Sequence, residues 1–103
     1  MPQVSVIAKL IAKEGKRDEL VSHLQKLVAA TEAEPGTLVY ALNVSTTEPE
    51  VVWFYELYTD QDALVAHGGS EAMKAAGAAM GDLVGAKTEL YFCEAVVGKG
   101  LPQ

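Results

Sequence analysis

The sequence predicts an α+β fold in which a four-stranded antiparallel sheet carries its helices on one face. Three observations predict it: four segments are rich in β-branched and aromatic residues, helical stretches separate them, and their order is β-α-β-β-α-β. The 103 residues, half of them hydrophobic and 21% charged, have the size and composition of one ordinary globular domain. We expect one domain over residues 1–103, with its core at 3–97 and a loose tail at 98–103.

The first strand and the first helix follow from two different periodicities. Residues 3–12, QVSVIAKLIA, are rich in β-branched side chains and predict a strand that ends before a turn at Gly15. From residue 16 to about residue 34, apolar side chains recur every three or four positions, which predicts one amphipathic helix. Pro35 and Gly36 stop that helix.

The two middle strands are predicted at residues 37–44, TLVYALNV, and 51–58, VVWFYELY. The polar turn STTEPE joins them, so an antiparallel hairpin is expected. A short helix, DQDALVAH, follows at residues 60–67, with Thr59 or Asp60 as its N-cap and two glycines at its end.

The last helix and strand complete the pattern. Residues 70–84 predict a helix that is capped by Ser70 and rich in alanine, and its methionines favour core packing. Residues 87–97, KTELYFCEAVV, predict the fourth strand. This element order is the split βαβ, or ferredoxin-like, arrangement of a four-stranded antiparallel sheet.

Both faces of the predicted sheet are apolar. The alternation of strand 51–58 divides its side chains into two sets: Trp53, Tyr55 and Leu57 on one face, and Val52, Phe54, Glu56 and Tyr58 on the other. A sheet with helices on one face and water on the other should instead alternate apolar and polar residues. We therefore expect a second copy of the chain to cover the helix-free face, giving a two-fold homodimer packed sheet against sheet. Trp53 and Tyr55 would lie in that interface.

Charge and cysteine usage narrow the partners and the location. Fourteen acidic against eight basic residues give a net charge of −6, and the basic residues are scattered, so neither nucleic acid nor an anionic membrane is an expected partner. No secretory signal and no apolar run of about 20 residues is present, which favours a cytoplasmic location. The single cysteine, Cys93, lies in an apolar run and is interpreted as a buried, inert thiol.

Glu56 and His67 are the two residues that could exchange a proton near neutral pH. His67 lies three residues after Leu64 and shares its buried helix face, while Glu56 shares a strand face with Phe54. A hydrogen bond between Glu56 and His67 is therefore expected. It could serve only to satisfy two buried polar groups, or it could orient the imidazole as a general base, and both roles stay open. The other histidine, His23, is expected at the surface or boundary of the first helix.

Two segments resemble a known family. EPGTLVYALN, residues 34–43, and FYELYTDQDALVAH, residues 54–67, occur in a β-α-β-β-α-β chain of about this length. Together they resemble the antibiotic biosynthesis monooxygenase domain, especially its quinol monooxygenase-like members, and the similarity covers residues 4–97. The resemblance implies a dimeric α+β barrel. It also implies a range of activities, since members include cofactor-free oxygenases of phenols and quinols, haem-degrading enzymes and an isomerase.

The function that the resemblance implies first is a cofactor-independent monooxygenase that oxidises a small aromatic, a quinol or polyphenol, with dioxygen. His67 would be the base and Glu56 its orienting partner. The expected substrate-binding residues are Tyr58, Phe54, Tyr40, Met73 and Phe92. No metal is expected, because no group of His, Asp, Glu or Cys has metal-ligand spacing.

Several alternatives remain. The chain could be a non-catalytic dimeric barrel that binds a small hydrophobic ligand, or an isomerase of a phosphorylated compound, although the pocket would then need cations. Haem degradation is less favoured, because haem-degrading members typically carry an asparagine on the first strand, whereas the only asparagine here, Asn43, lies on the second. A pocket of ~300 Å³ or more with His67 on its wall would favour a ligand site. An interior in which Glu56 fully satisfies His67 would favour a structural role.

Overall fold

The computed structural model describes residues 2–102 and contains a four-stranded antiparallel sheet with the strand order β2-β3-β1-β4. This is the predicted ferredoxin-like α+β arrangement. The strands are β1 (Val4–Ile11), β2 (Thr37–Val44), β3 (Val51–Tyr58) and β4 (Glu89–Glu94). The two hairpin strands have the predicted bounds, and the last strand is shorter at both ends than predicted.

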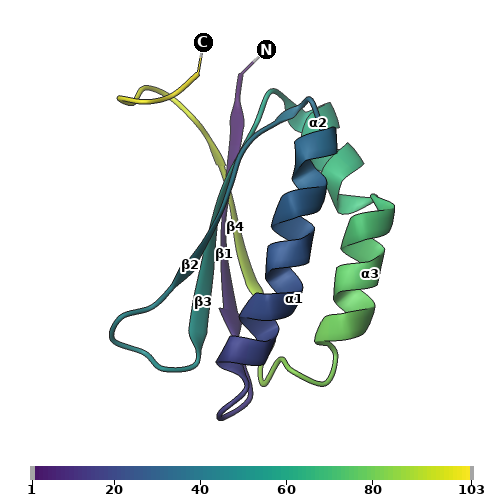
Figure 1. Cartoon of the computed structure of the whole chain (residues 1–103). Helices are drawn as coiled ribbons and strands as arrows, with labels where there is room; N and C mark the ends of the chain where they lie inside the picture. The colour runs from purple at the N-terminus through teal and green to yellow at the C-terminus, as the bar shows by residue number, and fades with distance from the viewer. Residues whose placement is uncertain (1, 103) are drawn as a thin grey trace.

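Three α-helices lie on one face of the sheet (Figure 1). They are α1 (Arg17–Ala30), α2 (Gln61–Gly68) and α3 (Glu71–Met80), and a 3₁₀ turn, η1 (Thr31–Ala33), follows α1. The predicted caps are confirmed: Asp60 accepts a hydrogen bond from the Ala63 amide at 2.9 Å, and Ser70 accepts one from the Met73 amide at 3.1 Å. None of the helices described in residues 2–102 is long and apolar enough to cross a membrane.

The hydrophobic core lies between α1 and the sheet. Leucines spaced along one stripe of α1 pack against alternate residues of β1 and β3. The register of β1 with β3 pairs Val6 with Glu56 and Ala8 with Phe54, and all four side chains are buried on the helix side. The predicted alternation of β3 is thus confirmed.

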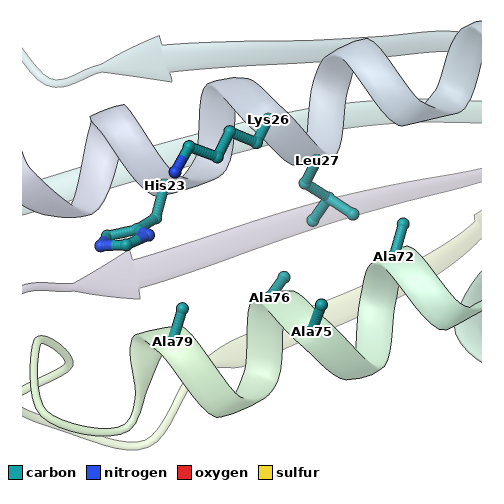
Figure 2. A pocket seen from close by; sticks show the side chains of 7 residues that line it. All are labelled: His23, Lys26, Leu27, Ala72, Ala75, Ala76 and Ala79. Carbon is teal, nitrogen blue, oxygen red and sulfur yellow. The ribbon is translucent and has the colours of Figure 1, made fainter.

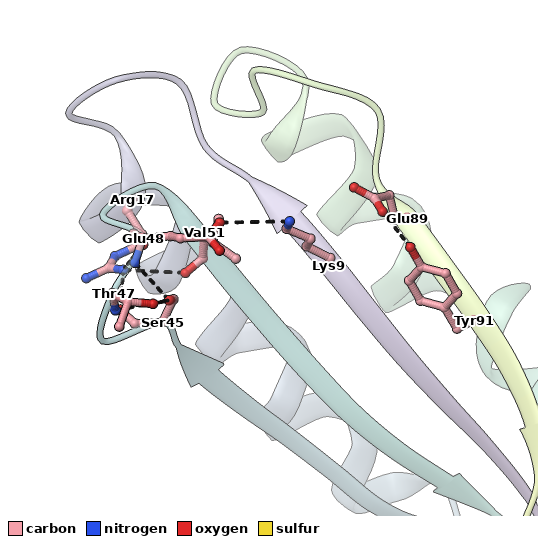
Figure 3. Close-up of polar contacts among 8 residues, drawn as sticks. All are labelled: Lys9, Arg17, Ser45, Thr47, Glu48, Val51, Glu89 and Tyr91. Carbon is pink, nitrogen blue, oxygen red and sulfur yellow. Dashed lines mark hydrogen bonds and ion pairs between the residues drawn. The ribbon is translucent and has the colours of Figure 1, made fainter.

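Arg17 contacts the β2–β3 loop at the end of the sheet that lies opposite α2 (Figure 3). Its guanidinium donates hydrogen bonds to the carbonyl oxygens of Ser45 at 2.9 Å and Glu48 at 3.1 Å, so it ties the start of α1 to the β2–β3 loop. Lys9 lies 3.8 Å from the Glu48 carboxylate and over the Trp53 ring, on the helix-free face. Arg17 and Lys9 are therefore engaged in contacts that hold this end of the fold together.

The edge strand β4 is left uncovered by the helices. Leu90 and Phe92 pair with core-facing residues of β1 and so point to the helix side, yet they are 51% and 63% exposed. The cause is that α1 and α2 pack on β2 and β3, while α3 packs on α1. Cys93 was predicted to be buried, and that prediction is wrong for this chain, because the residue lies exposed on the edge strand.

The segment after β4 is not wholly loose. The side-chain amide of Gln3 donates a hydrogen bond to the carbonyl oxygen of Pro102 at 2.7 Å, and Leu101 is half-buried. The predicted tail at 98–103 therefore turns back against the start of β1 over residues 98–102. Residues 1 and 103, which the predicted domain also includes, lie outside the described residues.

Candidate functional site

His67 is the centre of a polar cluster beneath α2. Only 3% of the residue is exposed, and its Nδ1 atom lies 2.8 Å from Oε1 of Glu34. The predicted hydrogen bond between His67 and Glu56 is therefore wrong. The cause is the position of α2 over the turn that leads into β2, where Glu34 lies within reach of the ring.

The Glu34-Pro35-Gly36 turn is built to hold α2 at this distance. Oε1 of Glu34 also accepts a hydrogen bond from the Thr37 hydroxyl at 2.7 Å, which fixes the carboxylate. The carbonyl of Gly36 accepts a hydrogen bond from the Thr59 amide at 3.0 Å, just before α2 begins. A Cβ at Gly36 would lie 2.5 Å from the Cβ of Ala63, so only glycine lets α2 approach this closely.

The contact with Glu34 assigns the protons of the His67 ring. A carboxylate accepts hydrogen bonds, so the proton of a neutral imidazole belongs on Nδ1, and the tautomer is assigned from this network. Nε2 then carries a lone pair, and it is buried with no hydrogen-bond partner in the described chain. An unpartnered buried polar atom costs about 1–3 kcal/mol. In this tautomer Nε2 is therefore a buried acceptor with no donor among the described residues.

Aromatic rings surround the imidazole. The Tyr40 ring stacks on Phe54 with centroids 4.5 Å apart, and it lies 4.8 Å from the ring of His67. Tyr58 is on β3, the other strand of the hairpin, and its ring centroid lies 5.5 Å from that of His67. Three of the five predicted substrate-binding residues thus gather around His67, on the side of the sheet that faces the helices.

Glu56 belongs to the same cluster but bonds to Tyr58. The Tyr58 hydroxyl donates a hydrogen bond of 2.6 Å to Oε1 of Glu56, and both side chains are buried. Burial raises the pKa of Glu56, while the hydrogen bond from Tyr58 partly opposes this rise. Burial also raises the pKa of Tyr58 and Tyr40, so both phenols stay neutral.

Two shallow pockets open on either side of Glu34. The first, called here the His67 pocket, has a volume of about 390 Å³ and is lined by Ala33, Glu34, Pro35, Gly36, Thr37, Asp62, Ala63, Ala66 and His67. The second, called the Tyr40 pocket, has a volume of about 360 Å³ and is lined by Val28, Thr31, Glu32, Glu34, Pro35, Thr37, Leu38 and Tyr40. Only the His67 pocket has His67 on its wall, and its volume exceeds the ~300 Å³ that would favour a ligand site.

Two predicted substrate-binding residues lie elsewhere. Met73 is on α3 and packs against the hydrophobic core. Phe92 lies on the uncovered edge strand, where it lines a separate pocket of about 330 Å³ together with Val4 and Gln61. The residue that sequence reasoning missed is Glu34. Its position directly before the Pro-Gly of the turn that leads into β2 was the available signal.

A further groove lies between α1 and α3 (Figure 2). Alanines along α3 face His23, Lys26 and Leu27 of α1, and the volume is about 360 Å³. His23 is half-buried there, so its predicted boundary position is confirmed. Within residues 2–102, no three His, Cys, Asp or Glu side chains group closely enough to hold a metal ion.

The fold is that of a class of small ferredoxin-like α+β proteins, here with a buried His–Glu contact between α2 and the turn before β2. Residues 3–79 match the family described as antibiotic biosynthesis monooxygenase. The chain belongs to this family. A search of curated protein sequences finds no match.

Solved structures agree with this assignment. A Caulobacter crescentus protein named for this family is 38% identical with a TM-score of 0.89, and the similarity covers 93% of this chain and 92% of that one. A Shewanella oneidensis protein is 31% identical with a TM-score of 0.87, covering 94% of each chain. A Mycobacterium tuberculosis protein is 25% identical with a TM-score of 0.85, covering 96% of this chain and 99% of that one.

Proposed function

We propose that this protein is a monooxygenase that oxidises a small hydroxylated aromatic, a quinol or polyphenol, with dioxygen and without a bound cofactor. The observation that carries the proposal is the unpartnered Nε2 atom of His67, held as a proton acceptor by Glu34 among aromatic rings. Family membership supports the oxygenase class. A phenolic hydroxyl is the donor that such an acceptor lacks.

In the proposed reaction, the substrate hydroxyl gives its proton to Nε2 of His67. The resulting phenolate is electron-rich enough to reduce dioxygen, and a bond forms between a ring carbon and one oxygen atom to give, after protonation, a hydroperoxide. Cleavage of the O–O bond with loss of the ring hydrogen leaves a quinone and releases water. One oxygen atom ends in the quinone and the other in water, and the substrate supplies all four electrons.

The remaining residues of the cluster have supporting roles in this proposal. Glu34 is the positioning residue that fixes the tautomer of His67. Because Nε2 is screened from solvent, a substrate reaches it only after a neighbouring side chain moves. We assign that movement to Tyr40, which contacts the His67 ring and also lines the Tyr40 pocket.

Oxygen uptake with a panel of quinols tests the proposal. We expect the wild-type protein to consume one dioxygen for each quinone formed. His67→Ala should lose about 100-fold or more of the rate, because general base catalysis contributes that much. Glu34→Gln should lose about tenfold through the wrong tautomer of His67.

His23→Ala is the matched control, because His23 lies in the distant groove between α1 and α3 and should leave the rate unchanged. A folded His67→Ala variant with the wild-type rate would contradict the assignment. Ligand binding without any oxygen uptake would favour a non-catalytic barrel that binds a small hydrophobic ligand.

We also propose that the protein is a homodimer. Apolar side chains remain exposed on both faces of the sheet. Ile7 and Tyr55, on the two central strands, and Tyr91, on β4, lie on the helix-free face, and Leu90 and Phe92 of β4 lie on the other face. Exposed apolar patches of this kind are typical of protein interfaces. A second copy packed on the helix-free face would cover the first three residues.

A further inference from the structure

We infer that the site selects hydroxylated aromatics that carry a positive charge, such as an arylalkylamine, and rejects those that carry a carboxylate. This inference rests on the proposed function for the hydroxylated ring. It adds the charge of the rest of the ligand. Two independent observations carry it: the acidic walls of both site pockets, and the buried acceptor nitrogen that needs a hydrogen-bond donor.

Acidic side chains lie on the walls of both pockets. Glu34 is shared by the two, Asp62 adds a second carboxylate to the His67 pocket, and Glu32 adds one to the Tyr40 pocket. Neither pocket has a lysine or an arginine on its wall. A ligand carboxylate placed in either pocket would therefore meet like charges with no cation among the lining residues to compensate them.

None of the eight basic residues lies on the wall of either pocket, and most lie well away from them. The turn between β1 and α1, which contains Lys13 and Lys16, and the β2–β3 loop lie at the end of the sheet opposite α2 (Figure 1). Arg17 binds that loop. Lys26 lines the groove between α1 and α3 (Figure 2). Lys74 lies 3.4 Å from the carboxylate of Glu71.

The walls of the two pockets therefore carry carboxylates and no lysine or arginine. The whole chain carries a net charge of −6, and clefts lined by one sign of charge focus the field and concentrate counter-ions. A cationic ligand is thus attracted to the pockets, and an anionic one is repelled before it reaches the ring site.

The polar cluster around His67 also favours ligand groups that donate hydrogen bonds. Only 3% of His67 is exposed, and its buried Nε2 atom has no hydrogen-bond partner among the described residues. As an acceptor, this nitrogen favours a ligand group that donates a hydrogen bond over one that accepts. Nearby Glu56 and the carboxylate of Glu34 are also acceptors. A ligand with a hydroxyl at one end and an ammonium group at the other matches both the buried acceptor and the acidic walls.

Binding of three matched probes tests the inference. Catechol, dopamine and 3,4-dihydroxyphenylacetate share one ring and differ in charge, being neutral, cationic and anionic. Affinities would be measured by calorimetry under anaerobic conditions, so that turnover plays no part. We expect dopamine to bind most tightly and 3,4-dihydroxyphenylacetate most weakly.

The variants Asp62→Asn and Glu32→Gln remove one carboxylate from each pocket while leaving His67 and Glu34 in place. We expect each to lower the affinity ratio of dopamine to 3,4-dihydroxyphenylacetate by roughly two- to fivefold, and high salt to lower it in the wild type. Asp82→Asn, which removes an exposed carboxylate beyond the far end of α3, should leave the ratio unchanged. Thermal unfolding of each variant checks that the fold is intact.

Equal or tighter binding of 3,4-dihydroxyphenylacetate would overturn the inference, as would a ratio that Asp62→Asn and Glu32→Gln both leave unchanged. The failure of the proposed function is a separate result. If dopamine binds most tightly but no quinol supports oxygen uptake, the charge preference holds and the monooxygenase proposal fails. If quinols are oxidised but the order of affinities is reversed, only the charge preference fails.

Discussion

The two carboxylates of the site cluster have different partners and therefore different chemistry. Glu34 is partly exposed and accepts hydrogen bonds from His67 and Thr37, so its charge is balanced by two donors. Glu56 is buried and receives one donor, the Tyr58 hydroxyl. Burial raises the pKa of Glu56, so the ionised form costs stability in the folded state.

The pH dependence of unfolding should reveal this cost. A carboxyl whose pKa is raised on folding binds more protons when folded, so stability falls as pH rises from its ordinary value near 4.5 toward the raised value. Glu56→Gln keeps an acceptor for Tyr58 but cannot ionise. We expect the free energy of unfolding of the variant, relative to wild type, to increase over that pH range.

Urea denaturation of both proteins at a series of pH values from 4 upward measures the difference. Glu32→Gln is the control, because Glu32 is exposed and should give a curve parallel to the wild type. A relative stability of Glu56→Gln that falls with rising pH would show that the ionised carboxylate is favoured in the folded protein.

Sequence reasoning identified most members of the cluster but paired them wrongly. Period-two alternation correctly placed Glu56 and Tyr58 on the helix side, and helical spacing correctly buried His67. Which carboxylate meets the imidazole depends on how α2 docks across the strands, and neither periodicity encodes that tertiary placement. Glu34, in the turn before β2, was therefore missed as the partner.

At the scale of elements, the docking of α2 depends on Gly36. This residue brings the turn before β2 within contact of Ala63, and so brings Glu34 to His67. Gly36→Ala should force α2 away from the turn and destabilise the protein by about 1–3 kcal/mol, the usual cost of overpacking. Chemical denaturation measures the loss, and oxygen uptake should fall with it.

Gly68→Ala is the matched control for this substitution. A Cβ at Gly68 meets nothing within 4 Å, so the change should be neutral or slightly stabilising. Ala63→Gly combined with Gly36→Ala removes the closest clash and should recover part of the loss, beyond the sum of the single effects. Additive effects in the double variant would contradict the proposed contact.

Strand ends were predicted correctly for the hairpin but not for the last strand. The hairpin strands were predicted to the residue, because a polar turn and alternation bound them on both sides. The last strand ends earlier than predicted, since Val96 and Val97 lie exposed beyond the last residue that pairs with β1. An apolar run shows that its residues favour burial, but it does not show whether they are covered by the same chain or by another.

At the scale of the whole molecule, the proposed homodimer has a direct test. Tyr55 lies near the middle of the helix-free face and is 39% exposed, so Tyr55→Glu would place a charge in the proposed interface. We expect sedimentation to show a dimer for wild type and a monomer for this variant at micromolar concentration. Val65→Glu is the control, because Val65 is exposed on α2, away from the helix-free face, and this variant should remain dimeric. A monomeric wild type would contradict the proposal.

In the proposed reaction, His67 presents an unprotonated Nε2 to a hydroxylated ligand. Nitrogen-15 NMR of histidine-labelled protein tests it most directly, because the chain has only two histidines and His23 is a distant internal reference. We predict that the proton of the His67 ring lies on Nδ1, and that the Nε2 resonance moves toward the protonated position on anaerobic addition of a quinol, while His23 does not change. A proton on Nε2 in the free protein, or a His67 signal that a saturating quinol leaves unchanged, would contradict the account.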